Sequence, residues 1–319
     1  MFSDSSMLFE YGLIGCFDTV CNMRGEETAI YIQRDEKDEY EENEEQLCNG
    51  SEEDDDISEH EEISYLELKA ASDDITAQLY HRFGVRHGDT VLIVCGQNAA
   101  GAEVVAMLSC IRICAIFVPL KVDGEKEKEK MKHIIDDARP IAAIVVADND
   151  SDPVVILLAE MGVFRACLVN KNGVLIMEEA SAADLRSDLP KNTAAAAATG
   201  GGGGGDVNDY DLPLYLLYTS GSTGQPKGVV GTHKGLLNRI SWQYTKFPYT
   251  FDEVTLRRTP LSFVDALAEV RPLSRCRRFN VVIFLFYYYD FKLLLDIFFF
   301  RFFPVCLRQF LCLFPWLNV

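Results

Sequence analysis

One short segment carries the residue types that bind phosphate. Residues 219–230 read TSGSTGQPKGVV and follow the apolar run LYLLY at 214–218. Glycines at three spaced positions let main-chain N–H groups approach a ligand closely. Hydroxyls and a lysine add hydrogen-bond donors and positive charge, a combination that suits a polyphosphate. The candidate phosphate ligands are Thr219, Ser220, Gly221, Ser222, Thr223, Gly224 and Lys227.

This segment differs from the P-loop of conventional NTPases. The P-loop motif places Ser or Thr directly after its lysine, whereas here Lys227 is followed by Gly228. An ordinary Gly/Ser surface turn is the alternative interpretation. It would not explain why a strand, spaced glycines, three hydroxyls and a Pro-Lys-Gly ending coincide. His233, six residues after Lys227, could transfer protons or make only a structural hydrogen bond.

The surrounding sequence predicts the elements that must position this loop. Short apolar or alternating runs predict strands at 28–33, 63–68, 91–95, 115–118, 141–147, 165–169 and 214–218. Apolar residues at helical spacing predict helices at 68–79, 99–112, 125–138 and 154–161. We expect Pro119 to end the strand before it. The alternation of strands and helices predicts an α/β fold with a largely parallel sheet flanked by helices on both faces.

Two segments interrupt this pattern. Residues 34–62 form an acidic insert, with 16 Asp or Glu among positions 35–62, and we expect it to be disordered through charge repulsion. It lies between two predicted strands, so it is interpreted as the loop of a hairpin. Residues 191–209 are rich in Ala and Gly and are interpreted as a linker loop.

Composition limits the classes of partner and compartment. The formal net charge of -19 argues against nucleic acid, whose binding needs clustered Lys and Arg. The ten cysteines form no CxxC pair, which argues against a zinc site and a disulfide framework and favours reduced thiols. The N-terminus lacks the basic region that precedes the apolar stretch of a secretory signal. We expect a cytoplasmic protein.

The run YTSGSTGQPKGVVGTH at 218–233 resembles the signature of the adenylate-forming superfamily, which includes acyl-CoA synthetases and amino-acid adenylation domains. The stretches ISYLEL (63–68) and 88–119 resemble the family's upstream elements. The chain departs from the family at Arg112, Ile113 and Cys114, where a glycine-rich turn is usual. The resemblance implies an incomplete N-terminal domain of the adenylate-forming fold, without the small C-terminal domain.

The same resemblance implies a two-step reaction. A carboxylate, which could be that of an amino acid, attacks the α-phosphate of Mg2+-ATP and gives an acyl-adenylate and pyrophosphate. A thiol of CoA, or the phosphopantetheine arm of a carrier protein, then takes the acyl group. The candidate phosphate ligands would hold the β- and γ-phosphates, and Lys227 and His233 would be the catalytic residues.

The segment TPLSFVDALAE at 259–269 falls where the family places its acyl pocket. Phe263 would line the pocket, and Asp265 would pair with the amino group of an amino-acid substrate. The alternative is that Asp265 caps the helix beginning near Ala266. The sequence RRTPLSFVDALAE at 257–269, together with the acidic insert, resembles the β-alanine-activating branch of the superfamily. This branch is related to aminoadipate-semialdehyde-dehydrogenase-like proteins and plant acyl-activating enzymes.

The last part of the chain does not follow the family. Residues 1–270 resemble a partial AMP-binding N-terminal domain, whereas 271–319 form a Phe-rich tail without the family's downstream adenine, ribose and lysine motifs. We interpret the chain as a truncated ligase that is inactive or weakly active. Two alternatives stay open: a non-catalytic interaction protein acting through the acidic segment, and a membrane-associated form that contacts the membrane only through residues 279–319.

Overall fold

Short apolar strands build a six-stranded sheet at the centre of the protein. The computed structural model describes residues 6–33, 60–95, 99–121, 128–147, 152–176, 211–220, 225–246, 254–257, 259–269 and 280–284. The strand order in the sheet is β6-β5-β3-β4-β7-β8. All neighbours are parallel except the last pair, so the predicted largely parallel sheet is confirmed. Its strands are β3 (Thr90–Val94), β4 (Ile116–Leu120), β5 (Ala142–Val146), β6 (Ala166–Val169), β7 (Pro213–Thr219) and β8 (Lys227–Thr232).

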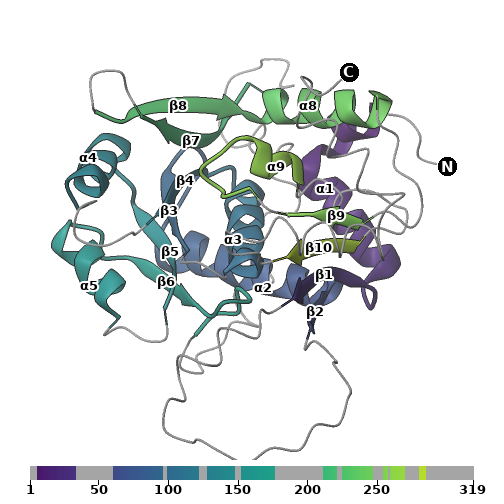
Figure 1. Ribbon diagram of the computed structural model, residues 1–319, viewed down its shortest axis with the longest axis horizontal. Coiled ribbons are helices and arrows are strands. Elements are labelled where there is room, and N and C mark those ends of the chain that lie inside the picture. The colour runs from purple at the N-terminus through teal and green to yellow at the C-terminus, as the bar shows by residue number, and fades with distance from the viewer. Residues whose placement is uncertain are drawn as a thin grey trace, which may run out of the picture.

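Successive residues of the central strands are buried on opposite faces. Val91 and Ile93 of β3 belong to the core beneath α2 (Tyr65–Ala77) and α3 (Ala100–Arg112). Leu92 and Val94 belong to a second core beneath α4 (Lys128–Ala138) and α5 (Pro153–Glu160). Because side chains alternate along a strand, an unbroken apolar run is what a strand covered on both faces requires. Figure 1 shows these helix pairs on the two sides of the sheet.

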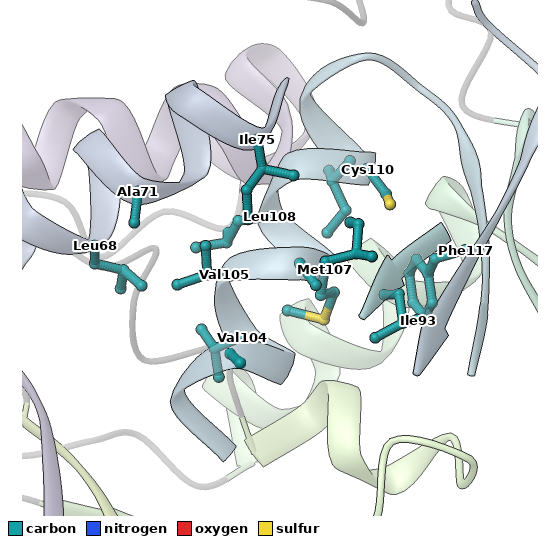
Figure 2. Packing of buried hydrophobic residues seen from close by; sticks show 14 of the residues in the cluster. Leu68, Ala71, Ile75, Ile93, Val104, Val105, Met107, Leu108, Cys110 and Phe117 are labelled. Carbon is teal, nitrogen blue, oxygen red and sulfur yellow. The ribbon is translucent and has the colours of Figure 1, made fainter. Parts of the chain in front are cut away.

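The larger core forms where α3 is held between α2 and the sheet. Figure 2 shows Leu68 and Ile75 of α2 facing Val105 of α3, while Met107 lies on the side of α3 toward Phe117 of β4. All five side chains are buried, with at most 2% of their surface exposed. α3 is therefore apolar on nearly every side, as expected of an interior helix.

A second sheet has the order β2-β1-β10-β9. β1 (Thr28–Gln33) and β2 (His60–Ser64) pair antiparallel, so the expected pairing is confirmed, although most of the acidic insert lies outside the described residues. β10 (Asn280–Phe284) lies parallel between β1 and β9 (Val254–Leu256). These five residues belong to the segment interpreted as a tail, and the domain boundary at residue 270 stays a prediction. The linker 191–209 also lies outside the described residues.

Two predictions about local structure were wrong. Residues 65–68 belong to α2 rather than to a strand, because Ser64 and Glu67 form a reciprocal capping box that starts the helix. β4 continues through Pro119, which pairs with Ile93. Pro119 lacks an N–H donor, but β4 meets β7 only at Phe117, so no β7 residue pairs with it. The kinked helix α1 (Ser6–Arg24) was not foreseen.

A buried arginine joins the three helices on one face. The Arg112 guanidinium donates to both carboxylate oxygens of Asp18 in α1, at 3.0 and 2.8 Å, and its Nε lies 3.0 Å from Asp73 Oδ1 in α2. A buried cation keeps its charge only when it is paired in this way. Arg112 therefore fixes α1 and α2 against α3. None of the helices among the described residues is long and apolar enough to cross a membrane.

The turn after α3 adopts at Cys114 a backbone conformation that suits the glycine expected from the resemblance. Cys114 has a φ of 52°, in the left-handed region that favours glycine. Its neighbour Ala115 donates to the Cys110 carbonyl at 3.0 Å, which closes the C-terminus of the helix. Cys114 is also buried, as are the other described cysteines. The side chain thus fills space in the core at the expense of a strained backbone.

We expect Cys114→Gly to be more stable than Cys114→Ala by about 1 kcal/mol, because both lose the thiol and only alanine keeps the left-handed strain. Urea denaturation of the two variants measures the difference. Cys110 within α3 is the matched control, where glycine should be less stable than alanine by about 1 kcal/mol. Equal stabilities of the two Cys114 variants would contradict this account.

Candidate functional site

The phosphate-loop segment, residues 220–226, is the connection of a β-hairpin at the edge of the central sheet. β7 and β8 pair antiparallel from Pro213 opposite Thr232 to Thr219 opposite Lys227. The pairing brings the two ends of segment 220–226 together, and Thr219 Oγ1 lies 3.4 Å from the Lys227 carbonyl oxygen. Three predicted ligands, Thr219, Ser220 and Lys227, thus come together. Gly221, Ser222, Thr223 and Gly224 lie outside the described residues.

The gathered side chains are open to a ligand. Thr219, Ser220 and Lys227 are all exposed. Two hydroxyls and an ammonium are groups that donate to phosphate oxygens. Mg2+ bound with the polyphosphate would be held largely through the phosphate oxygens, because this hard cation takes oxygen ligands and the Lys227 ammonium cannot serve as one. The arrangement can therefore hold the charged end of a polyphosphate at the surface of the sheet edge.

Glycines in β8 permit close contact with aromatic and aliphatic side chains of β7. A Cβ atom at Gly228 would lie 2.8 Å from Leu216 Cδ1 and 3.3 Å from the Tyr218 ring. At Gly231 a Cβ would overlap the Tyr215 ring. Gly228 therefore serves close side-chain packing, a role that its place in the motif did not reveal.

His233 lies at the opposite end of the hairpin from Lys227. It is the first residue of α8 (His233–Lys246), and its backbone N–H donates to the Leu212 carbonyl at 3.0 Å. Six residue steps along β8 span roughly 20 Å. The structure therefore does not bring the two predicted catalytic residues together, and their catalytic roles remain predictions.

The His233 ring is largely enclosed. Its Nε2 is buried and has no hydrogen-bond partner in the part of the chain that the structure describes. Burial lowers the pKa of the imidazole to about 4, and the nearby His87 contributes in the same direction. The imidazole is therefore neutral at pH 7. This enclosure favours the structural interpretation of His233, although no hydrogen bond is found at its Nε2 among the described residues.

The acyl-pocket segment is anchored by a buried ion pair that the sequence did not suggest. Arg257, with 3% of its side chain exposed, pairs with Glu103 in the first turn of α3. Arg257 Nη1 also donates to the Thr259 carbonyl at 2.8 Å. Thr259 in turn donates to Glu269 through its backbone N–H at 3.0 Å and its hydroxyl at 2.5 Å. The segment is thus closed at both ends and fixed to α3.

The two pocket residues predicted from the sequence lie within this closed segment. Phe263 is 61% exposed. Asp265 is the first residue of α9 (Asp265–Glu269), and its Oδ1 lies 3.4 Å from Arg239 Nη2 of α8. Both charged side chains are about half exposed, so the pair is solvated. A carboxylate in the first turn also suits the helix N-terminus. Their roles toward a substrate stay predictions.

Part of the chain is similar in sequence to known enzymes. Residues 41–275 match the profile of the family described as AMP-binding enzyme. The beta-alanyl-bioamine nonribosomal peptide synthetase ebony of Drosophila melanogaster is 32% identical over 184 residues, which are 57% of this chain and 18% of that protein.

Solved structures of low sequence identity share the fold. ATP-bound MatB from Rhodopseudomonas palustris has a TM-score of 0.56 at 18% identity, over 89% of this chain and 47% of that one. A fatty acyl-adenylate ligase from L. pneumophila, solved with acyl adenylate and pyrophosphate, has a TM-score of 0.58 at 17% identity, over 85% and 39%. The chain thus spans less than half of these solved chains and less than a fifth of the fly synthetase.

We expect the burial of His233 to make stability depend on pH. The unfolded chain takes up a proton on this residue near pH 6.5, the folded chain only near pH 4. The stabilisation is therefore complete above pH 6.5 and is lost as the pH falls toward 4. Between pH 7 and pH 5 the wild type should lose about 2 kcal/mol more than His233→Gln in urea denaturation. His81→Gln, at an exposed position, is the control, and parallel curves for wild type and His233→Gln would contradict the prediction.

Removing one partner of the Arg257–Glu103 pair should destabilise the fold strongly. Glu103→Gln leaves a buried guanidinium without its counter-charge, at a cost of about 3 kcal/mol in the free energy of unfolding. Burial raises the pKa of the Glu103 carboxyl against the opposing effect of Arg257, so the pair itself is costly to bury. The double variant Glu103→Leu/Arg257→Met should therefore recover most of the loss. Lys234→Met breaks the exposed pair with Asp211 and should cost less than about 1 kcal/mol; a similar cost for Glu103→Gln would refute this reasoning.

Proposed function

The chain belongs to the AMP-binding enzyme family, and from this premise we propose that it activates a carboxylate with ATP and releases pyrophosphate. Enzymes of this family use ATP and Mg2+. The observation that carries the proposal is the hairpin connection, where Thr219, Ser220 and Lys227 converge and are exposed.

The proposed chemistry is a displacement at phosphorus. A carboxylate oxygen forms a bond to the α-phosphorus, the bond from that phosphorus to the bridging oxygen breaks, and the electron pair leaves with pyrophosphate. Negative charge grows on the β- and γ-phosphates as the bond breaks. Fixed donors and the Lys227 ammonium stabilise that charge, which is the main way in which proteins accelerate phosphoryl transfer.

An amino acid of the β-alanine type is the carboxylate that we propose. The similarity to the beta-alanyl-bioamine synthetase supports this class of substrate. In the pocket segment, Asp265 offers a carboxylate for the substrate's ammonium group. Arg239 lies 3.4 Å away and is exposed, so its solvated side chain leaves the carboxylate accessible. We further propose that the aminoacyl group passes to a thiol, of CoA or of the phosphopantetheine arm of a carrier protein.

Exchange of labelled pyrophosphate into ATP tests the proposal directly. The 319-residue chain should catalyse weak exchange that depends on β-alanine or a similar amino acid. Lys227→Ala should lower the rate by about 100-fold, because a charged donor to the departing pyrophosphate is lost. Lys227 is exposed, so this substitution should leave the free energy of unfolding nearly unchanged.

Lys234→Ala is the matched control, since it removes the same charge from an exposed position in α8. It should exchange as the wild type does. Undiminished exchange by Lys227→Ala, or no exchange with any carboxylate, would reject the proposed function. Exchange with fatty acids alone would reject only the amino-acid assignment.

A further inference from the structure

One helix contacts the hairpin on both sides of the phosphate-loop segment. Tyr218, near the end of β7, donates its hydroxyl to Asp137 Oδ2 of α4 at 2.6 Å. Pro226, just before β8, accepts a hydrogen bond at its carbonyl from His133 Nε2 of the same helix at 3.2 Å. Because the acceptor is a carbonyl, the ring nitrogen must carry the proton. Figure 1 shows α4 beside this end of the hairpin.

The two helix residues are placed to act together. His133 and Asp137 are four positions apart, so they lie on the same side of α4. Another side of the helix carries Met131, Ile134 and Ile135, which are buried against the central sheet. α4 is therefore fixed to the sheet and presents two polar side chains to the hairpin from a rigid support.

The hairpin needs such a support at this end. Among the described residues, β7 joins β4 through the single register pair of Phe117 with Tyr215. Toward the loop, the exposed strand β8 is the partner of β7, and Val229 and Val230 are about half exposed. A two-stranded ribbon on its own is only marginally stable. The bonds from α4 therefore act on the part of the hairpin that the central sheet holds least.

From this geometry we infer that His133 and Asp137 are positioning residues for phosphate binding. His133 fixes Pro226 just before β8, and Asp137 fixes Tyr218 near the end of β7. The two strand ends held in this way present Thr219, Ser220 and Lys227 to the ligand. Neither residue needs to touch the ligand. Holding the stems in place before binding lowers the entropy that the ligand must overcome. The inference rests on the proposed function, since it concerns the same phosphate site.

Binding of Mg2+-ATP and of inorganic tripolyphosphate to the 319-residue chain, measured by isothermal titration calorimetry, tests the inference. Tyr218→Phe removes one hydroxyl without changing charge and should weaken both ligands about fivefold. Asp137→Ala should weaken them to a similar degree. The double variant should be no weaker than either single one, because both substitutions break the same bond.

The second contact is tested by rescue. His133→Ala should weaken both ligands about fivefold, whereas His133→Gln, which keeps an N–H donor, should bind within about twofold of the wild type. Asp136→Ala removes an exposed carboxylate from the neighbouring position of α4 and should also stay within about twofold. Urea denaturation of every variant separates weakened binding from lost folding.

The outcomes distinguish the inference from the proposed function. If Tyr218→Phe and His133→Ala bind as the wild type does while Lys227→Ala fails to bind, the positioning role is wrong and the phosphate site stands. The same holds if these two variants lose stability while keeping wild-type affinity. If the wild-type chain binds neither ligand, the phosphate site itself is wrong and the positioning role falls with it.

Discussion

The backbone pairing of β7 with β8 is the constraint on which the candidate site depends. It sets Thr219 opposite Lys227 and so fixes both ends of the segment between them. The donors are therefore brought together by main-chain hydrogen bonds, which are insensitive to side-chain rotamers. That pairing in turn needs the small residue Gly231, over which the Tyr215 ring lies, and Tyr215 is the residue through which the hairpin joins the central sheet. A change in this packing would be transmitted to the donors without touching them.

The central sheet provides the rigid part of this arrangement because its strands are buried on both faces. The alternation of Val91 and Ile93 with Leu92 and Val94 divides the apolar side chains between two cores. Each core has its own helix layer, so displacement of the sheet would expose apolar surface on both sides. This pattern is local in the sequence, which is why the α/β class and most of the central strands and helices could be predicted. The candidate phosphate ligands could be proposed from the sequence for the same reason, since they follow one another along the chain.

What the sequence did not reveal depends on competition between local signals or on distant partners. At residues 65–68 the apolar pattern suggests a strand, but the capping box of Ser64 with Glu67 decides for a helix. β8 carries two glycines in six residues, and its own sequence shows no clear strand signal. Arg257 and its partner Glu103 are 154 positions apart, and no spacing rule relates them. The contact of Tyr218 with Asp137 spans 81 positions and is equally invisible before the chain is folded.

The polar contacts around the candidate phosphate site and those around segment 259–269 differ in burial. This difference decides how much each contact contributes to the stability of the fold. The bond of Tyr218 to Asp137 lies near the surface, where water competes for both groups, so its net contribution to folding is small. The bond still restricts where the end of β7 can lie, because it forms only when the Tyr218 hydroxyl is close to Asp137 and points toward it. The Arg257–Glu103 pair is buried, so the loss of one partner leaves a charge that the interior cannot solvate. The geometry of the proposed phosphate site is therefore separable from the stability of the fold, whereas the position of segment 259–269 is tied to that stability.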